Sequence, residues 1–299
     1  MRDLRHTRIG TAVLAVGLLL TACSSGGTSS SSSASPSPSS SGLQRYVALG
    51  DSFSAGPLVP TTDLAGGCAR SDHDYPSLVA RALKVRLVDV TCSGATTRDL
   101  TQVQRPFGDA RIPPQLRSVT PATDLVTLGI GGNDLDLFAT LISTCTRLRS
   151  SDPTGSPCAD RLAAKGPDLE GATATISSRV AASLRAIRQR APRARILLVG
   201  YLRLVPDTGT CAKLPLATGD YAEGRLISRA LDRSLSQAAK RTGVTFVDMY
   251  AASRGHDICS EQPWVNGSVT NRQRALAYHP FAVGMRADAA RVLAALGQG

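Results

Sequence analysis

The chain has 299 residues, of which 42% are hydrophobic, enough to build a sizeable buried core. Its formal net charge is +11, but no nucleic-acid-binding motif accompanies the basic residues, so we expect no RNA or DNA partner. The positive charge would attract anionic lipid headgroups or anionic wall polymers outside a cell. An Arg-rich solvated surface without a dedicated partner explains it equally well.

The N-terminus predicts export. Basic residues precede an apolar run over residues 9–20, which is too short to span a bilayer as a helix. The sequence Leu-Thr-Ala-Cys that ends at Cys23 resembles the lipobox of bacterial lipoproteins. We therefore expect residues 1–22 to be a lipoprotein signal peptide and Cys23 to be a lipid anchor at the extracellular face of the cell membrane. An ordinary secretory signal cut elsewhere is the alternative.

The segment after Cys23 has the composition of a tether. Residues 24–42 contain twelve Ser, three Gly and two Pro, too little apolar surface to form a core. We expect residues 23–43 to be a lipidated, disordered linker and residues 44–299 to form one domain, since no internal repeat divides them. We expect that domain to be monomeric.

Seven cysteines suit an exported protein better than a cytosolic one. Setting Cys23 aside leaves an even number that predicts three disulfides: Cys68, Cys92, Cys145, Cys158, Cys211 and Cys259. Spacing alone allows fifteen pairings for six cysteines. Zinc binding is the alternative, but there is no Cys-x-x-Cys pair and no histidine at ligand spacing. We expect no metal and no organic cofactor.

Alternation of short apolar runs with longer amphipathic segments predicts parallel strands joined by helices. The strands are expected at residues 46–49, 86–90, 125–130, 196–199 and 244–247. Apolar residues recur at helical spacing over residues 176–187 and 227–238, and these faces should cover the sheet. Residues 143–168 and 202–220 are rich in Gly, Pro and Cys and are expected to be loop insertions. The pattern predicts a three-layer α/β/α sandwich with a five-stranded parallel sheet in a flavodoxin-like order.

The sequence Gly50-Asp51-Ser52 follows the first predicted strand, at the edge where parallel sheets gather ligands. The second glycine of the Gly-x-Ser-x-Gly elbow is missing, which argues against an α/β-hydrolase fold. Taken alone, Ser52 could equally be a helix N-cap or a turn residue.

Three further blocks strengthen the case for chemistry. They are Cys-Ser-Gly-Ala-Thr around Gly94, Gly-Ile-Gly-Gly-Asn-Asp around Asn133, and His279 followed by Pro280. With these blocks the chain resembles the SGNH (GDSL) hydrolases, whose Ser, Gly, Asn and His blocks appear here in the same order. The resemblance extends over the chain after the linker, and is greatest to a secreted, actinobacterial-type lipase and esterase subset with three disulfides.

The resemblance implies that Ser52 is the nucleophile and His279 the general base. It also implies an oxyanion hole made by the backbone N–H groups of Ser52 and Gly94 and by the side-chain amide of Asn133. Outside this family context, Gly94 reads as a turn glycine and Asn133 as a loop cap. The other mature histidines, His73 and His256, are expected to be structural.

The sequence departs from the family pattern in one place. Many members carry Asp three residues before the histidine, but that position is Leu276 here. The actinobacterial-type subset implies a Ser-His dyad, oriented by the main-chain carbonyl of Leu276; Asp248 or Asp257 could instead act as a hidden acid. The same subset implies the pairings Cys68–Cys92, Cys145–Cys158 and Cys211–Cys259.

The expected reaction is hydrolysis of a carboxylic ester, in an acyl lipid or a small molecule, through an acyl-enzyme on serine. Activity should rise through the ordinary histidine pKa of about 6.5. Two alternatives remain at this point. One is a deacetylase of carbohydrate or wall polymer that uses the same dyad. The other is a surface binding lipoprotein that keeps the hydrolase fold but is catalytically inactive.

Overall fold

The computed structural model describes residues 42–106, 109–165 and 168–298. The strands are β1 (Arg45–Gly50), β2 (Thr62–Asp63), β3 (Arg70–Ser71), β4 (Arg86–Asp89), β5 (Leu125–Gly129), β6 (Arg195–Val199) and β7 (Thr245–Val247). The helices are α1 (Ser52–Ala55), α2 (Tyr75–Leu83), α3 (Leu137–Ala139), α4 (Thr146–Leu148), α5 (Pro157–Lys165), α6 (Leu169–Arg190), α7 (Asp220–Thr242), α8 (Met249–Ala252) and α9 (Ala282–Ala295). Turns of 3-10 helix lie at Thr97–Leu100, Gln115–Ser118 and Asp134–Asp136, and a π-helical turn lies at Thr140–Cys145.

The central sheet has five strands in the order β4-β1-β5-β6-β7, and every neighbouring pair is parallel. The five predicted strands are confirmed to within one residue at each end. The chain passes from β1 outward to β4 and then returns to the other side of β1 as β5. In sheets of this kind, ligands bind beyond the carboxyl ends of the two strands at such a reversal, here β1 and β5.

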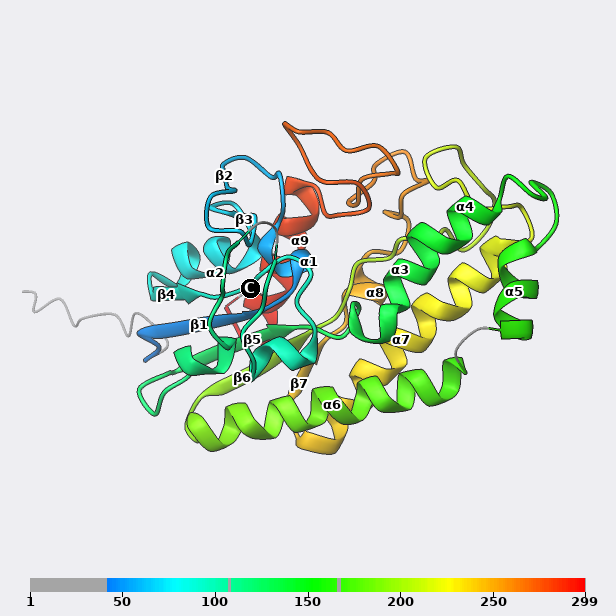
Figure 1. Cartoon of the computed structure of the whole chain (residues 1–299). Helices are drawn as coiled ribbons and strands as arrows, with labels where there is room; N and C mark the ends of the chain where they lie inside the picture. The colour runs from blue at the N-terminus through cyan, green and yellow to red at the C-terminus, as the bar shows by residue number, and fades with distance from the viewer. Residues whose placement is uncertain (1–41, 107–108, 166–167, 299) are drawn as a thin grey trace, which may run out of the picture. The chain divides into compact units, whose positions relative to one another are not determined.

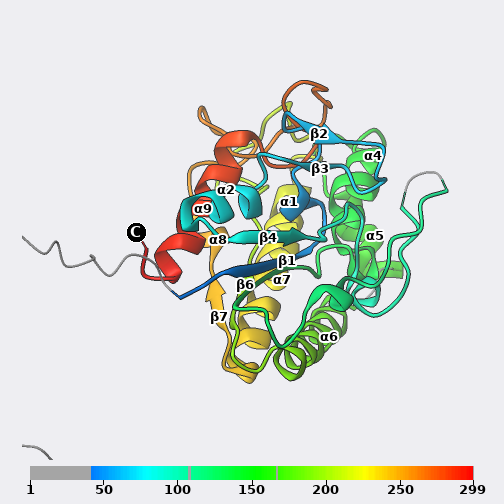
Figure 2. The same cartoon turned by 90° about the vertical axis from the view of Figure 1, so that its left-hand side faces the viewer.

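Helices cover both faces of the sheet, which confirms the three-layer prediction. Helices α2 and α9 pack together on one face and α6 and α7 on the other (Figures 1 and 2). The predicted apolar faces of α6 and α7 are buried, because residues spaced three or four apart lie on one side of a helix. All five residues of β5 are buried, so this strand forms the centre of the core.

Two elements differ from the sequence prediction. Strands β2 and β3 pair as a short antiparallel hairpin before α2, too short to leave an alternation signal. Residues 143–168, predicted as a loop, contain α4 and α5; α5 packs against α7 and α4 continues the π-helical turn before it, and this packing overrides their Gly- and Pro-rich flanks. Residues 202–219 form a loop, as predicted, and residue 220 begins α7.

The three disulfides pair as the family resemblance implied: Cys68–Cys92, Cys145–Cys158 and Cys211–Cys259. All six cysteines are thereby used in covalent bonds, which excludes the zinc alternative for them. The predicted signal peptide, the lipid anchor Cys23 and most of the predicted linker lie outside the described residues. Within the described ranges, no helix is both long and apolar enough to cross a membrane.

Replacing Leu128 of β5 with alanine should lower the free energy of unfolding by about 2–5 kcal/mol, because it removes fully buried methyl groups and leaves a cavity. Urea unfolding followed by circular dichroism measures the change. The matched control is Leu64→Ala, at a side chain that is 56% exposed, with an expected change under about 0.5 kcal/mol. Equal effects of the two substitutions would contradict the central position of β5.

Candidate active site

Ser52 lies just beyond the carboxyl end of β1, as the first residue of α1. Asp51 caps the short helix α1, its Oδ1 accepting the Phe53 N–H at 2.9 Å, and Ser52 is the first helical residue. Gly50 at the end of β1 is in register with Gly129 at the end of β5. Gln115 fixes this strand end from the side, since its amide accepts the Gly50 N–H and donates to the Gly50 carbonyl. The serine therefore stands on a rigid strand end.

The structure brings Ser52 and His279 together across 227 residues of sequence. The His279 Nε2 lies 2.8 Å from the Ser52 Oγ. The other ring nitrogen, Nδ1, lies 2.7 Å from the main-chain carbonyl oxygen of Ala277. Because a carbonyl can only accept, Nδ1 carries the proton and Nε2 is free to accept one from serine.

The prediction that the Leu276 carbonyl orients the histidine is wrong. That carbonyl accepts the His279 backbone N–H at 3.2 Å and the Asn266 side-chain amide at 3.1 Å, so it belongs to a turn. Tyr278 adopts a left-handed conformation with φ of 61°, which turns the Ala277 carbonyl toward the ring instead. A main-chain carbonyl therefore contacts His279 where a triad acid would, as predicted, but it is the carbonyl of Ala277 and not that of Leu276.

Both aspartates considered as hidden acids have other partners. The Asp248 side chain caps α8 by accepting the Ala251 N–H, and the Asp257 side chain accepts the Cys259 N–H. His256 stacks on Trp264 with ring centroids 4.1 Å apart, which makes both of them part of a loop scaffold. The third histidine among the described residues, His73, is exposed and pairs with its neighbour Asp72.

The two other block residues flank the serine from neighbouring loops. Gly94 is exposed in the turn after β4 with φ of 77°, and a Cβ there would meet nothing within 4 Å, so backbone conformation and not crowding calls for glycine. The Asn133 Nδ2 donates one hydrogen to the Ala95 carbonyl at 2.9 Å. Because the amide has two hydrogens, the second remains available to a substrate oxygen.

Buried polar contacts tie these loops together. The Asp134 carboxylate, 1% exposed, accepts the Thr97 backbone N–H at 2.9 Å and the Thr97 hydroxyl. Arg179 of α6 lies 3.3 Å from the same carboxylate and balances its charge. The loop that carries Gly94 is thus bound to the loop that carries Asn133.

Tyr201, two residues beyond β6, joins the loop that carries Ser52 to the loop that carries Asn133. Its hydroxyl donates to the Asp51 Oδ2 and accepts the Gly132 N–H at 2.8 Å. Its ring packs edge-on against Phe53 and Phe138, with centroids 5.1 and 4.9 Å apart. A side chain on Gly132 would overlap the Phe138 ring, so glycine is what allows this close approach.

Burial shifts the pKa of both titratable groups nearest Ser52. Desolvation raises the pKa of Asp51 to about 7, against the opposing hydrogen bonds from Tyr201 and Phe53. Desolvation lowers the pKa of His279 to about 4, although the Ala277 carbonyl acts in the opposite direction. The imidazole is therefore neutral at pH 7 and able to accept a proton, and it stays so further into acid than the ordinary value of about 6.5 implies.

Comparison with known proteins agrees with this geometry. The model of the GDSL-like lipase/acylhydrolase family matches residues 48–287. The chain belongs to this family. It is 40% identical over 260 residues to Lipase 2 of Streptomyces coelicolor, covering 84% of this chain and 85% of that protein.

Two solved structures of the same kind superpose well. The extracellular lipase of Streptomyces rimosus has a TM-score of 0.69 and 29% identity, covering 85% of this chain and 100% of the other. The phospholipase A1 of Streptomyces albidoflavus NA297 has the same TM-score and identity, covering 84% of this chain and 99% of the other. The chain is accordingly a serine hydrolase of carboxylic esters with the α/β fold of this family. Its three disulfides indicate an exported protein, because such bonds persist in oxidising compartments.

Sequence reasoning missed Tyr201 and Ala277. Tyr201 lies two residues after the fourth predicted strand, which ends at residue 199, and a tyrosine just beyond a carboxyl strand end is a position that could have been examined. Nothing in the sequence distinguishes Ala277 from Leu276, because the choice between their carbonyls depends on one backbone torsion at Tyr278.

Substituting Tyr201 by phenylalanine should lower kcat about 10- to 100-fold with little change in KM. The loss of one hydroxyl leaves the Asp51 Oδ2 and the Gly132 N–H unpaired and lets the two loops shift apart. Steady-state kinetics on a soluble ester measures this. The control is Tyr46→Phe, which removes a buried hydroxyl bonded to Thr127 at 2.7 Å inside the sheet and should leave kcat unchanged. A similar loss of kcat in both variants would indicate general destabilisation.

The pH profile should report the low pKa of His279. Only neutral imidazole can accept the serine proton, so kcat/KM should fall on the acid side with a midpoint near pH 4, where His279 titrates, and not near 6.5. Nuclear magnetic resonance of the imidazole signal that disappears in His279→Gln gives the same pKa directly, with circular dichroism as the check that the protein remains folded. A midpoint near 6.5 in both measurements would contradict burial as the controlling factor.

Proposed function

We propose that Ser52 and His279 act as a catalytic dyad that hydrolyses carboxylic esters in two acyl-transfer steps. The observation that carries this proposal is the 2.8 Å contact between the Ser52 Oγ and a histidine nitrogen whose partner nitrogen is held by a carbonyl. Ser52, His279 and the Ala277 carbonyl thus form one continuous chain of hydrogen bonds, which is the arrangement that activates a serine.

In the first step the Ser52 oxygen attacks the ester carbonyl carbon while His279 takes its proton. The negative charge that forms on the carbonyl oxygen is stabilised by the N–H groups of Ser52 and Gly94 and by the free amide hydrogen of Asn133. The imidazolium then returns the proton to the departing alcohol. Water, deprotonated by the same histidine, attacks the acyl-enzyme and releases the acid.

The Ala277 carbonyl replaces a triad aspartate in orienting the histidine but not in stabilising its positive charge. It fixes the ring orientation and the tautomer of His279 by accepting the Nδ1 hydrogen. A neutral carbonyl stabilises the transient imidazolium less than a carboxylate would. We therefore expect the oxyanion donors to carry a large share of the transition-state stabilisation in this enzyme.

The proposed substrate is an acyl lipid or small acyl ester met outside the cell. The relatives named above are lipases and a phospholipase A1, which supports an acyl-lipid substrate.

We also propose that cleavage before Cys23 and its acylation anchor the monomeric domain, residues 44–299, at the outer face of the cell membrane. Incorporation of labelled palmitate, and its loss in Cys23→Ala, tests the anchor.

Ser52→Ala and His279→Gln should each lower kcat by about 10⁴-fold or more on chromogenic acetyl, butyryl, octanoyl and palmitoyl esters, because neither dyad member works alone. His256→Gln is the control and should keep wild-type activity, since that ring stacks on Trp264 and its Nδ1 bonds the Gln262 carbonyl, with no contact to Ser52. An active-site-directed phosphonate should label one serine per chain. Absence of turnover and of labelling in folded wild-type protein would favour the binding-lipoprotein alternative, and activity on acetyl esters alone would favour the deacetylase.

A further inference from the structure

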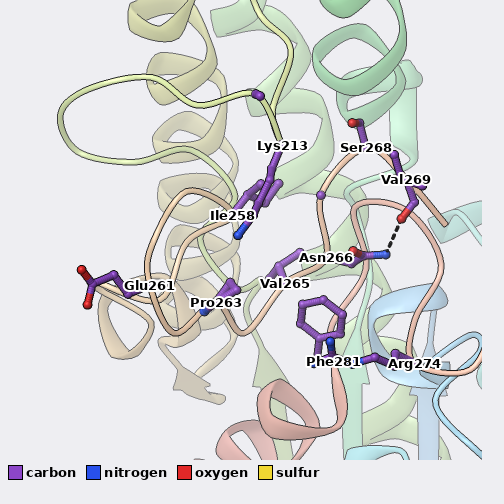
Figure 3. Close-up of a pocket in the computed structure, with 12 residues that line it drawn as sticks. Lys213, Ile258, Glu261, Pro263, Val265, Asn266, Ser268, Val269, Arg274 and Phe281 are labelled. Carbon is purple, nitrogen blue, oxygen red and sulfur yellow. Dashed lines mark hydrogen bonds between the residues drawn. The ribbon is translucent and has the colours of Figure 1, made fainter. Parts of the chain in front are cut away.

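Buried side-chain amides hold two of the loops that carry block residues. In the loop that leads to the histidine, Asn266 donates its Nδ2 to the Val269 carbonyl at 2.9 Å, at the wall of a cavity (Figure 3). In the loop that carries Gly94, Gln104 is only 6% exposed, and its Nε2 donates to the Ser93 carbonyl at 2.9 Å. This second amide has no role in the steps above.

The Ser93 carbonyl and the Gly94 N–H belong to the same peptide unit. This unit is planar and trans, so its C=O and N–H point in opposite directions. Among the described residues, only Gln104 donates to the Ser93 carbonyl, and the Gly94 N–H donates to no protein group. One end of the unit is held in the interior, and the other is left for a substrate oxygen.

The same peptide unit is the centre of a β-turn that has two possible forms. The Ala95 N–H closes the turn by donating to the Cys92 carbonyl at 3.0 Å. Because φ is 77° at Gly94 and negative at Ser93, the turn is of type II. A type I turn keeps the closing bond but has the central peptide unit turned over, and glycine accommodates either form. A change to type I would point the Gly94 N–H the opposite way.

Gln104 distinguishes the two forms, whereas the other contacts of the turn do not. The disulfide Cys68–Cys92 and the Ser93 N–H, which donates to the Cys68 carbonyl at 3.0 Å, precede the central peptide unit and suit either form. The bond from the Gln104 amide is made to the Ser93 oxygen, which moves away when the unit turns over. This bond therefore favours type II.

Gln104 is itself fixed, and its burial has a cost. It exchanges two main-chain hydrogen bonds with Ile112, at 3.0 and 2.9 Å. Its buried Oε1 has no partner among the described residues, which is unfavourable. An apolar side chain of the same shape would avoid that cost, so the contribution of the amide is the bond to Ser93 and not stability.

The other main-chain donor of the oxyanion hole is held without such a side chain. The peptide unit that ends in the Ser52 N–H begins with the Asp51 carbonyl, which accepts the Ala55 N–H at 3.0 Å within α1. The helix thus holds this carbonyl. Gly94 lies before the 3-10 turn that begins at Thr97, so its peptide unit depends on a side chain instead.

We propose that Gln104 is a positioning residue of the oxyanion hole, whose amide keeps the Cys92–Ala95 turn in the form that directs the Gly94 N–H toward the substrate oxygen. The inference rests on the proposed ester hydrolysis at Ser52. Gln104 acts through the peptide unit and not on the reacting atoms. Its bond to the carbonyl also polarises the unit, which makes the N–H a stronger donor.

The test replaces Gln104 with methionine, which has nearly the same shape but no hydrogen to donate. For a butyryl ester, kcat/KM should fall about 10- to 100-fold, up to the lower range for loss of an oxyanion donor. The affinity of a boronic acid that forms a tetrahedral adduct with Ser52 should fall by the same factor, and the acid limb of the pH profile should not move. Gln102→Met, at an exposed side chain of the same loop, is the matched control and should change none of these.

Gln104→Glu tests the hydrogen bond itself. The introduced carboxyl can donate to the Ser93 carbonyl only while it is protonated, and burial favours that form. Activity relative to wild type should therefore be about tenfold higher at pH 5 than at pH 9. For Gln104→Met the corresponding ratio should be the same at both pH values.

The outcomes separate the positioning role from the catalytic proposal. Wild-type kcat/KM in folded Gln104→Met overturns the positioning role, and so does a loss of kcat/KM without a loss of boronate affinity. If Gln104→Met does not fold, the pH comparison of Gln104→Glu decides, and a ratio that stays constant between pH 5 and 9 overturns the role. If folded wild-type protein hydrolyses no ester, it is the proposed dyad function that fails.

Discussion

The parallel pairing of β1 with β5 is the constraint on which the active site depends. Register places Gly50 beside Gly129, and each strand is then followed by a loop at the same edge of the sheet, which carries Ser52 after β1 and Asn133 after β5. The crossover to β4 brings Gly94 to the same edge. Three segments separated by about forty residues each thus converge without any one of them encoding the site alone, because carboxyl ends of parallel strands meet at one edge.

Convergence of the loops at one edge does not by itself fix their side chains relative to one another. Buried polar contacts between the loops do so. Thr97 binds Asp134, and the Tyr201 hydroxyl bridges Asp51 and Gly132, so that the loops carrying Ser52, Gly94 and Asn133 are bound to one another. In a low-dielectric interior such contacts are costly to leave unpaired and therefore specify one arrangement. This network holds the loops of Gly94 and Asn133 in place, and the Ala277 carbonyl holds the ring of His279.

The loop that carries His279 is held at several points. Its turn presents the Ala277 carbonyl to the imidazole, and its earlier part is tied to the loop of residues 202–219 by the Cys211–Cys259 disulfide. The Asn266 N–H donates to the His279 carbonyl and connects this earlier part to the histidine segment. The position of His279 therefore depends on a stretch of backbone that a disulfide and main-chain hydrogen bonds hold in place.

The sequence by itself determined the fold class, the five strands and the four block residues, because apolar periodicity reports which side of an element is buried and the blocks follow the strand ends in order. The even set of cysteines pointed to three disulfides, but their pairing came from family resemblance. Tertiary structure alone decided which carbonyl orients His279, that Tyr201 bridges two loops, and how far burial lowers the histidine pKa. These features depend on one torsion, on contacts across 150 residues and on exclusion of water, none of which leaves a local pattern in the chain.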